Sequence, residues 1–169
     1  YVTHDQNEAM TFADEVLVMR AGRVVQKGAP KELFERPRDL FVGSFIGSPG
    51  MNFIPVTVSD GCIMIDGQHR IMDTASNLPA DVSGLTLGIR PEHVRIVGQD
   101  EPGVPVQVFQ VQDQGSVRVI DVRIGSAALK VKVPRRYGPP QDITRLAIPA
   151  RHAQLYRNDV WLQSLTEAA

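Results

Sequence analysis

The sequence predicts a mainly β protein in which a small barrel or sandwich follows a short α/β segment. After residue 50, short alternating or β-branched runs separated by turn formers fill the chain, with no long helical pattern among them. Before residue 50, strand-like and helix-like patterns alternate. We therefore expect two domains, 1–50 and 51–169, divided at the turn-rich run Gly47-Ser48-Pro49-Gly50.

The first element is the short apolar run Tyr1 to Thr3. Its β-branched composition is typical of the end of a buried strand, so we expect the chain to be cut from a longer protein. Asp5 and Glu8 have the spacing of a capping box and predict a helix behind them. The inner face of that helix is expected to hold Ala9, Met10 and Ala13, with Phe12 beside them.

A hairpin and two short helices follow. The runs 15–19 and 23–27 are strand-like, and Ala21-Gly22 between them predicts an antiparallel return. Pro30 suits a first helical position, so we expect a helix over 31–36 that turns Leu33 and Phe34 inward. A second short helix is expected over 40–46.

The second domain is predicted to consist of short strands joined by turns. In one of them, Ile120, Val122 and Ile124 form an apolar face by strict alternation. The expected strands cover residues 54–58, 62–65, 85–89, 104–111, 117–124, 127–133, 143–148 and 160–162.

This domain also contains an internal repeat. Residues 87–96 and 146–155 share Leu, Ile, His and a final aliphatic residue at the same offsets, 59 positions apart. Each copy predicts a strand, a proline-containing turn, one turn of helix and a further strand. The repeat favours a barrel built from two related halves.

Composition narrows the function classes. Eighteen Lys and Arg against nineteen Asp and Glu give a net charge of −1, which disfavours a protein that binds nucleic acid by neutralising phosphates. The hydrophobic content of 43% excludes wholesale disorder. The single cysteine, Cys62, excludes an internal disulfide and a multi-cysteine zinc site, and its place in an alternating strand predicts a small core residue. No apolar run approaches the roughly 20 residues that cross a bilayer.

His4 is the strongest candidate for chemistry among the individual residues. It follows a predicted strand and precedes a capped helix, which is where open α/β sheets bind ligands. An imidazole there can donate a hydrogen bond to a phosphate. Position alone leaves the alternative open that His4 is a strand-end residue satisfied by nearby backbone.

The remaining candidates have structural explanations. Asp5 and Glu8 suit a helix cap better than a catalytic pair. His93 and His152 lie at matching turns of the repeat, where a side-chain to backbone bond is favoured over a ligand role. His69 is expected to be isolated and exposed. Further expectations are a solvated loop at Arg135, Arg136 and Tyr137, and packing of the two domains by Phe45, Met51 and Phe53.

A long pattern of residues carries a family resemblance. The pattern resembles the end of the nucleotide-binding domain of ATP-binding-cassette (ABC) transporter ATPases, in the subfamily that serves importers of sugars, polyols and glycerol phosphate. It runs through Tyr1-Val2-Thr3-His4-Asp5-Gln6, Glu8-Ala9-Met10, Ala13-Asp14, Gly22-Arg23-Val24, Gly28-Ala29-Pro30, Leu33-Phe34, Arg36-Pro37, Phe41-Val42, Phe45-Ile46-Gly47-Ser48-Pro49 and Met51-Asn52-Phe53.

A second motif, Leu87-Gly88-Ile89-Arg90-Pro91-Glu92-His93, resembles the signature of that subfamily's C-terminal regulatory barrel. The resemblance implies an OB-fold-like (TOBE/MOP) domain related to molybdate-binding domains. It also implies that His4 is the switch histidine, which contacts the terminal phosphate of ATP and helps to organise the attacking water.

The resemblance further implies cofactors, partners and a location for the intact subunit. The cofactors would be ATP and Mg²⁺. The partners would be a second copy bound through the barrel, transmembrane permease subunits and a regulatory protein, with no nucleic acid. The subunit would be peripheral, on the cytoplasmic face of the inner membrane.

The sequence departs from the family pattern in one large respect. It has no Gly-Lys pair and therefore no phosphate-binding loop, and the glycine-rich family signature, the magnesium-binding Asp and the catalytic Glu are also missing. His4 alone offers ATP neither a lysine nor a metal, so we expect residues 1–169 to have no ATPase activity and to bind no metal or cofactor by themselves.

Two alternatives stay open. One is a self-standing barrel that binds a small ligand or an oxyanion in the manner of molybdate-binding domains. The other is binding of single-stranded nucleic acid, which only the barrel type suggests. Ten aromatic residues and the absence of a cationic excess argue against the second alternative.

Overall fold

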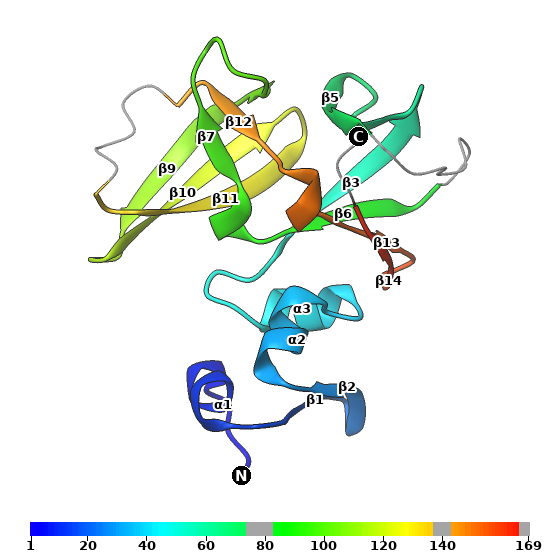
Figure 1. The fold of residues 1–169 in the computed structure, drawn as a ribbon, viewed down its shortest axis with the longest axis vertical. Coiled ribbons are helices and arrows are strands. Elements are labelled where there is room, and N and C mark those ends of the chain that lie inside the picture. The colour runs from blue at the N-terminus through cyan, green and yellow to red at the C-terminus, as the bar shows by residue number, and fades with distance from the viewer. Residues whose placement is uncertain (74–82, 137–142, 166–169) are drawn as a thin grey trace.

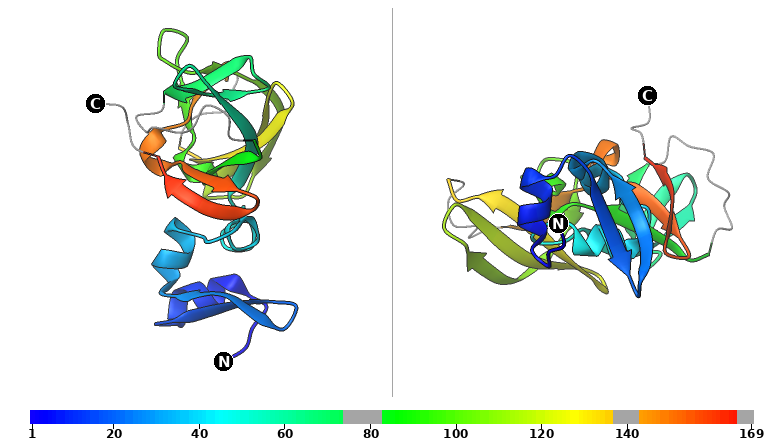
Figure 2. Two further views of the ribbon diagram at one scale, coloured as in Figure 1. Left: turned by 90° about the vertical axis from the view of Figure 1, so that its right-hand side faces the viewer. Right: turned by 90° about the horizontal axis from the view of Figure 1, so that it is seen from below.

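The computed structural model describes residues 1–73, 83–136 and 143–165, and the chain forms two parts stacked along its longest axis (Figure 1). The N-terminal part holds the helices and one hairpin, and the β-rich part above it holds the remaining strands; the left view of Figure 2 shows the same division. Strands account for 49% and helices for 17% of the structure, which confirms the mainly β class, although the sheets do not close into one barrel.

The N-terminal part packs three short helices and a hairpin around its own apolar cluster. The cluster consists of Val16, Val18, Leu33, Val42 and Ile46. The hairpin strands pair antiparallel, as predicted. The elements are α1 (Gln6–Phe12), β1 (Val16–Arg20), β2 (Arg23–Gly28), α2 (Pro30–Glu35) and α3 (Leu40–Phe45).

Two expectations for this part are wrong. Tyr1 to Thr3 forms no strand, because no strand of the described residues pairs with it, and the Tyr1 and Val2 side chains are fully exposed. Phe12 is also exposed, at 85%, although Ala9 and Met10 of the same helix pack against the cluster. The inner face of α1 is therefore narrower than the apolar pattern suggests.

The β-rich part consists of one large sheet and two small ones. A six-stranded sheet has the order β14-β13-β6-β3-β4-β5, and two three-stranded sheets have the orders β11-β10-β9 and β7-β12-β8. The strands are β3 (Asn52–Ser59), β4 (Cys62–Ile65), β5 (His69–Asp73), β6 (Leu85–Ile89), β7 (Arg95–Val97), β8 (Val104–Pro105), β9 (Gln107–Asp113), β10 (Val117–Ile124), β11 (Ala127–Pro134), β12 (Arg145–Ala147), β13 (Gln154–Arg157) and β14 (Val160–Ser164), with the 3-10 helices η1 (Pro91–His93) and η2 (Ala150–His152).

A second apolar cluster fills this part, from Ile54 to Leu165. The predicted face of Ile120, Val122 and Ile124 lies in it, each side chain at most 1% exposed. The two clusters share no residue. The first ends at Ile46 and the second begins at Ile54, and the predicted domain boundary lies between these positions in the sequence. The division into domains 1–50 and 51–169 stays a prediction.

The internal repeat has a structural counterpart. One copy is β6-η1-β7 and the other is β12-η2-β13, with the same order of elements. Their strands pair reciprocally, because β6 pairs with β13 and β7 pairs with β12. The first strand of each copy therefore lies beside the second strand of the other, which is the pairing of two units related by a local two-fold axis.

Three further expectations need correction. The expected strand 104–111 is interrupted at Val106, whose N–H donates to the Thr144 carbonyl rather than to a ladder partner. His69 is half-buried in β5, a strand that the sequence pattern did not indicate. Cys62 is not a core residue, because Ile63 and Ile65 occupy the buried face of β4 and Cys62 faces the other way, with its thiol 3.3 Å from Asp73.

Candidate functional site: His4 and the junction at Arg90

His4 lies on an exposed bend directly before α1. Hydrogen bonds among its neighbours shape this bend. The Asp5 carboxylate caps α1 by accepting from the Asn7 N–H at 2.7 Å, which confirms its predicted role. Glu8 does not complete a capping box, because its carboxylate accepts from the Tyr1 hydroxyl at 2.9 Å and the Thr3 hydroxyl at 3.0 Å. These contacts leave the His4 side chain open to solvent.

The start of α1 is tied to the turn that follows α3. The Gln6 amide donates to the Gly47 carbonyl at 3.3 Å and accepts from the Gly47 N–H at 2.7 Å. Gly47 has φ +111°, a conformation that favours glycine. The position of His4 therefore depends on a backbone turn 41 residues away from Gln6 in the sequence.

Arg90 joins the two parts of the molecule. Its side chain is 2% exposed and leaves the end of β6 to enter the N-terminal part. Its guanidinium donates to the Phe34 carbonyl from Nε at 3.1 Å and from Nη2 at 2.7 Å, and from Nη1 to the Gly43 carbonyl at 3.0 Å and to the Ile46 carbonyl. These carbonyls lie near the C-terminal ends of α2 and α3, where a positive charge is favourable.

Burial changes the electrostatics of Arg90. The pKa of the guanidinium is lowered to about 10, mainly because burial removes water from the cation. Electrostatic interactions with Glu92 and Tyr156 raise the pKa and offset part of this effect. The cation is held by carbonyl dipoles and by the Phe34 ring, which lies 4.2 Å from the guanidinium carbon. Arg90 is therefore a structural clamp that stays charged at neutral pH.

Two more side chains of the β-rich part reach the N-terminal part beside Arg90. The fully buried Tyr156 hydroxyl lies 3.1 Å from the Pro37 carbonyl and 2.9 Å from the Gln154 amide oxygen. The Gln154 amide donates to the Glu35 carbonyl. Phe53 meets the Tyr156 ring edge-on at 5.3 Å. The segment after α2 is thus fixed by β13.

The predicted packing of the two parts is confirmed for Phe53, whose ring lies directly against Gly43 of α3 as well as on Tyr156. Met51 is 6% exposed, but its sulfur lies 3.7 Å from the Tyr156 hydroxyl within the β-rich part, and it is its backbone N–H that reaches the N-terminal part by donating to the Gly43 carbonyl at 3.0 Å. Phe45 is 45% exposed and stacks on Phe41 of its own helix instead. Helix α3 turns its other face toward the core, with Val42 fully buried.

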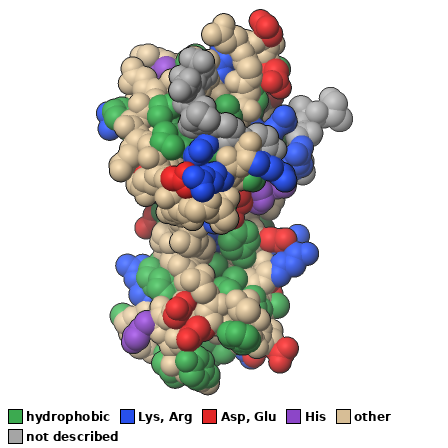
Figure 3. Space-filling model, turned by 90° about the vertical axis from the view of Figure 1, so that its left-hand side faces the viewer, with side chains coloured by type: hydrophobic (Ala, Val, Ile, Leu, Met, Phe, Trp, Pro, Cys, Tyr) green, Lys and Arg blue, Asp and Glu red, His purple; other side chains and the backbone are tan. Residues whose placement is uncertain are grey.

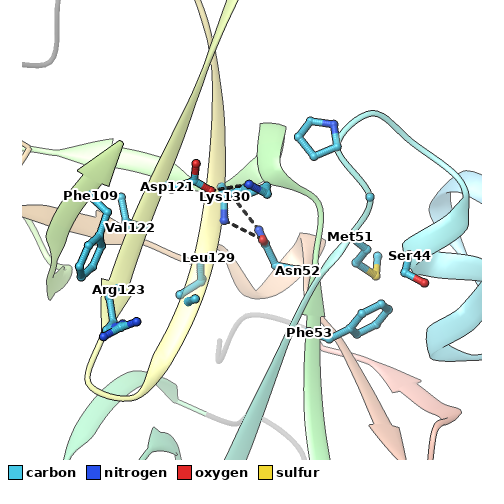
Figure 4. Close-up of a pocket in the computed structure, with 13 residues that line it drawn as sticks. Ser44, Met51, Asn52, Phe53, Phe109, Asp121, Val122, Arg123, Leu129 and Lys130 are labelled. Carbon is cyan, nitrogen blue, oxygen red and sulfur yellow. Dashed lines mark hydrogen bonds and ion pairs between the residues drawn. The ribbon is translucent and has the colours of Figure 1, made fainter. Parts of the chain in front are cut away.

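An amide bridge joins β3 to β11. The Asn52 side chain donates to the Lys130 carbonyl and accepts from the Lys130 N–H, both at 2.8 Å, as a neighbouring strand would (Figure 4). The Lys130 ammonium pairs with Asp121, and Arg123 lies 4.7 Å from the centre of the Phe109 ring. A cavity of about 530 Å³ opens here, but the Asn52, Asp121 and Lys130 side chains that line it already have these partners.

His93 and His152 do not lie apart at their two turns. Their rings stack at 4.0 Å with an angle of 19° between the planes. Arg151 Nε donates to His152 Nε2 at 3.1 Å. Among the interactions of the described residues, neither imidazole makes the predicted hydrogen bond to the backbone of its own turn. The local two-fold arrangement of the repeat instead stacks the two rings on each other.

No cluster of metal-ligating side chains lies beside His4 among the described residues. Within residues 1–73, 83–136 and 143–165, no three His, Cys, Asp or Glu side chains gather as metal ligands. A phosphate contact by His4 stays a prediction, and the sequence has no Gly-Lys pair for a phosphate-binding loop. The described helices also include none long and apolar enough to cross a membrane. Of the predicted solvated loop, Arg135 is exposed and pairs with Asp113 at 3.1 Å, while Tyr137 lies outside the described residues.

Comparisons with known proteins identify the chain's relatives. A family model described as the MalK OB fold domain matches residues 47–94, and one described as the TOBE domain matches residues 87–155, from the start of one repeat copy to the end of the other. The uncharacterized ABC transporter ATP-binding protein y4oS of Sinorhizobium fredii is 43% identical over 146 residues, covering 82% of this chain and 38% of y4oS. The chain is related to the C-terminal region of ABC transporter ATP-binding subunits.

Other ABC transporter subunits support the same conclusion. The sn-glycerol-3-phosphate import ATP-binding protein UgpC of Escherichia coli K12 is 40% identical over 151 residues, covering 85% of this chain and 41% of UgpC. UgpC of Paraburkholderia xenovorans is 37% identical over 164 residues, covering 92% of this chain and 45% of that protein. The chain thus spans less than half the length of these ABC relatives and corresponds to their C-terminal region. The family resemblance that the sequence suggested is confirmed.

Sequence reasoning missed the residues that hold the junction of this ABC subunit. Arg90 and Gln6 belong to the motifs that carry the resemblance, but the sequence gives neither of them a role, and Gln154 and Tyr156 are not among its candidate residues. One signal was available: Arg90 ends a run of apolar strand residues and precedes a proline. A cation at the end of a buried strand needs hydrogen-bond acceptors from elsewhere in the fold.

Proposed function

We propose that this chain is the C-terminal part of the ATP-binding subunit of an ABC importer for glycerol phosphate or a related sugar or polyol. The intact subunit would couple ATP hydrolysis to import. The observation that carries the proposal is the match to UgpC proteins over 164 residues together with both domain models. The single exposed imidazole before α1 and the β-rich part behind it suit that assignment.

In this proposal His4 contacts the terminal phosphate of ATP and helps to position the attacking water. Its exposure supports the role, because a ligand can reach the imidazole. The neighbouring residues would position His4. Asp5 caps the start of α1, and the Gln6 side chain hydrogen-bonds to the backbone of Gly47. The phosphate-binding loop and metal ligands of the site would be contributed by residues other than these 169.

The β-rich part would act as the regulatory module. Arg90 grips the carbonyls of Gly43 and Ile46 just before Gly47, and Gly47 holds Gln6 beside His4. A partner or ligand that favours one position of the β-rich part could thereby bias the position of His4. Partners in this proposal are permease subunits at the cytoplasmic face of the membrane and a regulatory protein.

A second copy of the chain is the further proposed partner. The edge strand β9 supports this, since Val108, Phe109 and Val111 are exposed along it at 38%, 59% and 43%. An exposed apolar edge strand is a surface that proteins usually cover. Sedimentation of the chain with and without Phe109→Asp tests the proposal: a dimer that the substitution dissociates supports it, and a monomer at all concentrations contradicts it.

A chimera tests the main proposal. The C-terminal region of Escherichia coli UgpC is replaced by residues 1–169, and uptake of sn-glycerol 3-phosphate and ATP hydrolysis are measured. We expect both activities in the chimera and, for a lost phosphate contact, a fall of about 100-fold or more in hydrolysis for His4→Ala. Asn7→Ala changes an exposed residue of the adjacent helix α1, is the matched control and should retain full activity. A chimera that assembles but hydrolyses ATP equally well with His4→Ala would contradict the assignment.

We also propose that the 169-residue chain by itself does not hydrolyse ATP, because it lacks the lysine and metal ligands that hold the phosphates. Phosphate release by the purified chain should equal the buffer rate. Turnover above that rate, lost on His4→Ala, would refute the prediction.

A further inference from the structure

A closed turn lies between the two parts of the molecule, beside the start of α1. It runs from Gly43 to Met51, and the Met51 N–H closes it by donating to the Gly43 carbonyl at 3.0 Å. Gly47 in its middle has φ +111°, and a Cβ added there would lie 2.9 Å from Arg90 Nη1. The turn therefore has little room to change its shape, and we expect it to move as a unit.

Side chains from both parts of the molecule hold this turn. From the N-terminal part, the Gln6 amide accepts from the Gly47 N–H at 2.7 Å and donates to the Gly47 carbonyl at 3.3 Å. From the β-rich part, the Lys132 ammonium donates to the next carbonyl, that of Ser48, at 2.6 Å. Because the two contacts are on adjacent residues, a displacement of Ser48 by β11 also displaces the backbone groups that bind Gln6.

The Lys132 contact can be altered without disrupting the junction. Lys132 lies on the outer face of β11, where it alternates with the buried residues Leu129 and Val131. It makes a single bond to the turn, near the surface, where a charged contact contributes little to stability. Arg90, in contrast, is 2% exposed and binds three carbonyls. Lys132 is therefore the contact through which a small change in the β-rich part can reach the turn.

His4 lies at the other end of this path. Gln6 is the first residue of α1, two positions after His4, and it is half-buried whereas His4 is exposed. Figure 3 shows histidine surface (purple) low on the N-terminal part, and His4 is the one histidine of residues 1–50. Gln6 thus anchors the backbone next to an exposed imidazole to the turn that Lys132 holds.

We propose that Gln6 and Lys132 are positioning residues for His4 and act in series through the backbone of Gly47 and Ser48. Lys132 holds Ser48, the turn holds Gln6, and Gln6 fixes the backbone from which the imidazole reaches a phosphate. Control of hydrolysis by the β-rich part then depends on whether Lys132 is bound to Ser48. The inference rests on the proposed function for its effect on hydrolysis, because His4 acts on ATP only in the intact subunit.

Kinetics of the UgpC chimera separate positioning from general structural support. Gln6→Ala should lower kcat about tenfold and Lys132→Met about threefold, with KM for ATP changed by less than about twofold, because the alignment of His4 is lost and ATP binding is not. Lys132→Arg keeps a donor for Ser48 and should restore most of the rate. Lys130→Met is the matched control on the same face of β11, since its ammonium pairs with Asp121 and not with the turn, and kcat should be unchanged.

Double-mutant cycles in the chimera test whether the two residues act through His4. When His4→Ala is already present, Gln6→Ala and Lys132→Met should have no further effect on kcat. When Gln6→Ala is present, Lys132→Met should likewise have none. Effects that multiply in these double variants would overturn the inference even where His4→Ala alone lowers hydrolysis, as the proposed function requires.

NMR of the 169-residue chain gives a second measurement that does not need ATP hydrolysis. The Gly47 amide should exchange about tenfold faster in Gln6→Ala and about threefold faster in Lys132→Met. The His4 imidazole resonances should shift in both variants and stay unchanged in Lys130→Met. Gln6→Glu keeps the acceptor for the Gly47 N–H and replaces Gln6→Ala if thermal unfolding shows that the alanine variant does not fold.

These results distinguish the inference from the proposed function. Unchanged Gly47 exchange and unchanged His4 resonances in Lys132→Met would overturn the inference whatever the chimera does. If both change but the chimera hydrolyses ATP equally well with His4→Ala, the path from Lys132 to His4 exists and the proposed function is wrong.

Discussion

Replacing Arg90 by methionine should weaken the junction between the two parts more than the same replacement of any exposed arginine. Methionine keeps an unbranched apolar stem of similar length and removes the guanidinium. The carbonyls of Phe34 and Ile46 then lose their donor in a buried setting, while the Gly43 carbonyl keeps the Met51 N–H at 3.0 Å. The N-terminal part would keep its own apolar cluster but lose the clamp that fixes α2 and α3 to β6.

The size of the effect follows from these contacts. A buried carbonyl left without a donor costs about 1 kcal/mol or more, so the Phe34 and Ile46 carbonyls cost at least about 2 kcal/mol, and the lost second bond to the Gly43 carbonyl adds up to about 1 kcal/mol. The variant also avoids desolvating a cation, which is the cause of the lowered pKa of Arg90, and this gain offsets part of the loss from charge-assisted bonding. We expect Arg90→Met to lower the free energy of unfolding by about 3 kcal/mol. Arg90→Lys, which keeps the charge but not the planar fork, should cost roughly half as much.

Urea unfolding of the 169-residue chain measures the loss, with Arg95→Met as the control. Arg95 is exposed on β7, and its replacement should change stability by less than about 0.5 kcal/mol. Hydrogen exchange locates the effect, because amides of 30–46 should lose protection while those of β10 and β11 keep it. Arg90→Met within about 0.5 kcal/mol of the unsubstituted chain would refute the clamp.

Three other substitutions test neighbouring interactions. Asn52→Ala removes both bonds to the Lys130 backbone and should lower the free energy of unfolding by about 2 kcal/mol, measured by urea unfolding; an unchanged midpoint would contradict the bridge. Tyr156→Phe keeps the edge-on contact with Phe53 but loses the hydroxyl, and should cost about 1 kcal/mol in the same assay. The pKa of His93 is lowered on folding, so the unfolded chain binds its proton more tightly and stability should fall as the pH drops below 6.5 toward the folded value. His93→Gln should flatten this dependence in thermal scans between pH 5 and 8 (roughly the range in which histidine titrates), and an unchanged slope would show that other groups cause it.

Local patterns were sufficient to predict many of the elements. Alternation places Ile120, Val122 and Ile124 on one face, and the core confirms it. Asp5 caps α1 because its carboxylate reaches the second residue of the helix, an interaction that depends on spacing alone. The same local reasoning failed for Cys62, since alternation gives two faces of a strand and does not say which one the core covers.

The family and the mainly β class could therefore be inferred from the sequence alone, because helix caps, strand alternation, turn residues and motifs each depend on a few neighbouring positions. The contacts at the junction could not be inferred in this way. Arg90 meets carbonyls that lie 56, 47 and 44 residues before it, and His93 stacks on a ring 59 positions away. The tertiary structure alone decides which backbone carbonyls bind the buried cation and which imidazoles come into contact. These interactions form between segments that are distant in the sequence, so no regular spacing of residues predicts them.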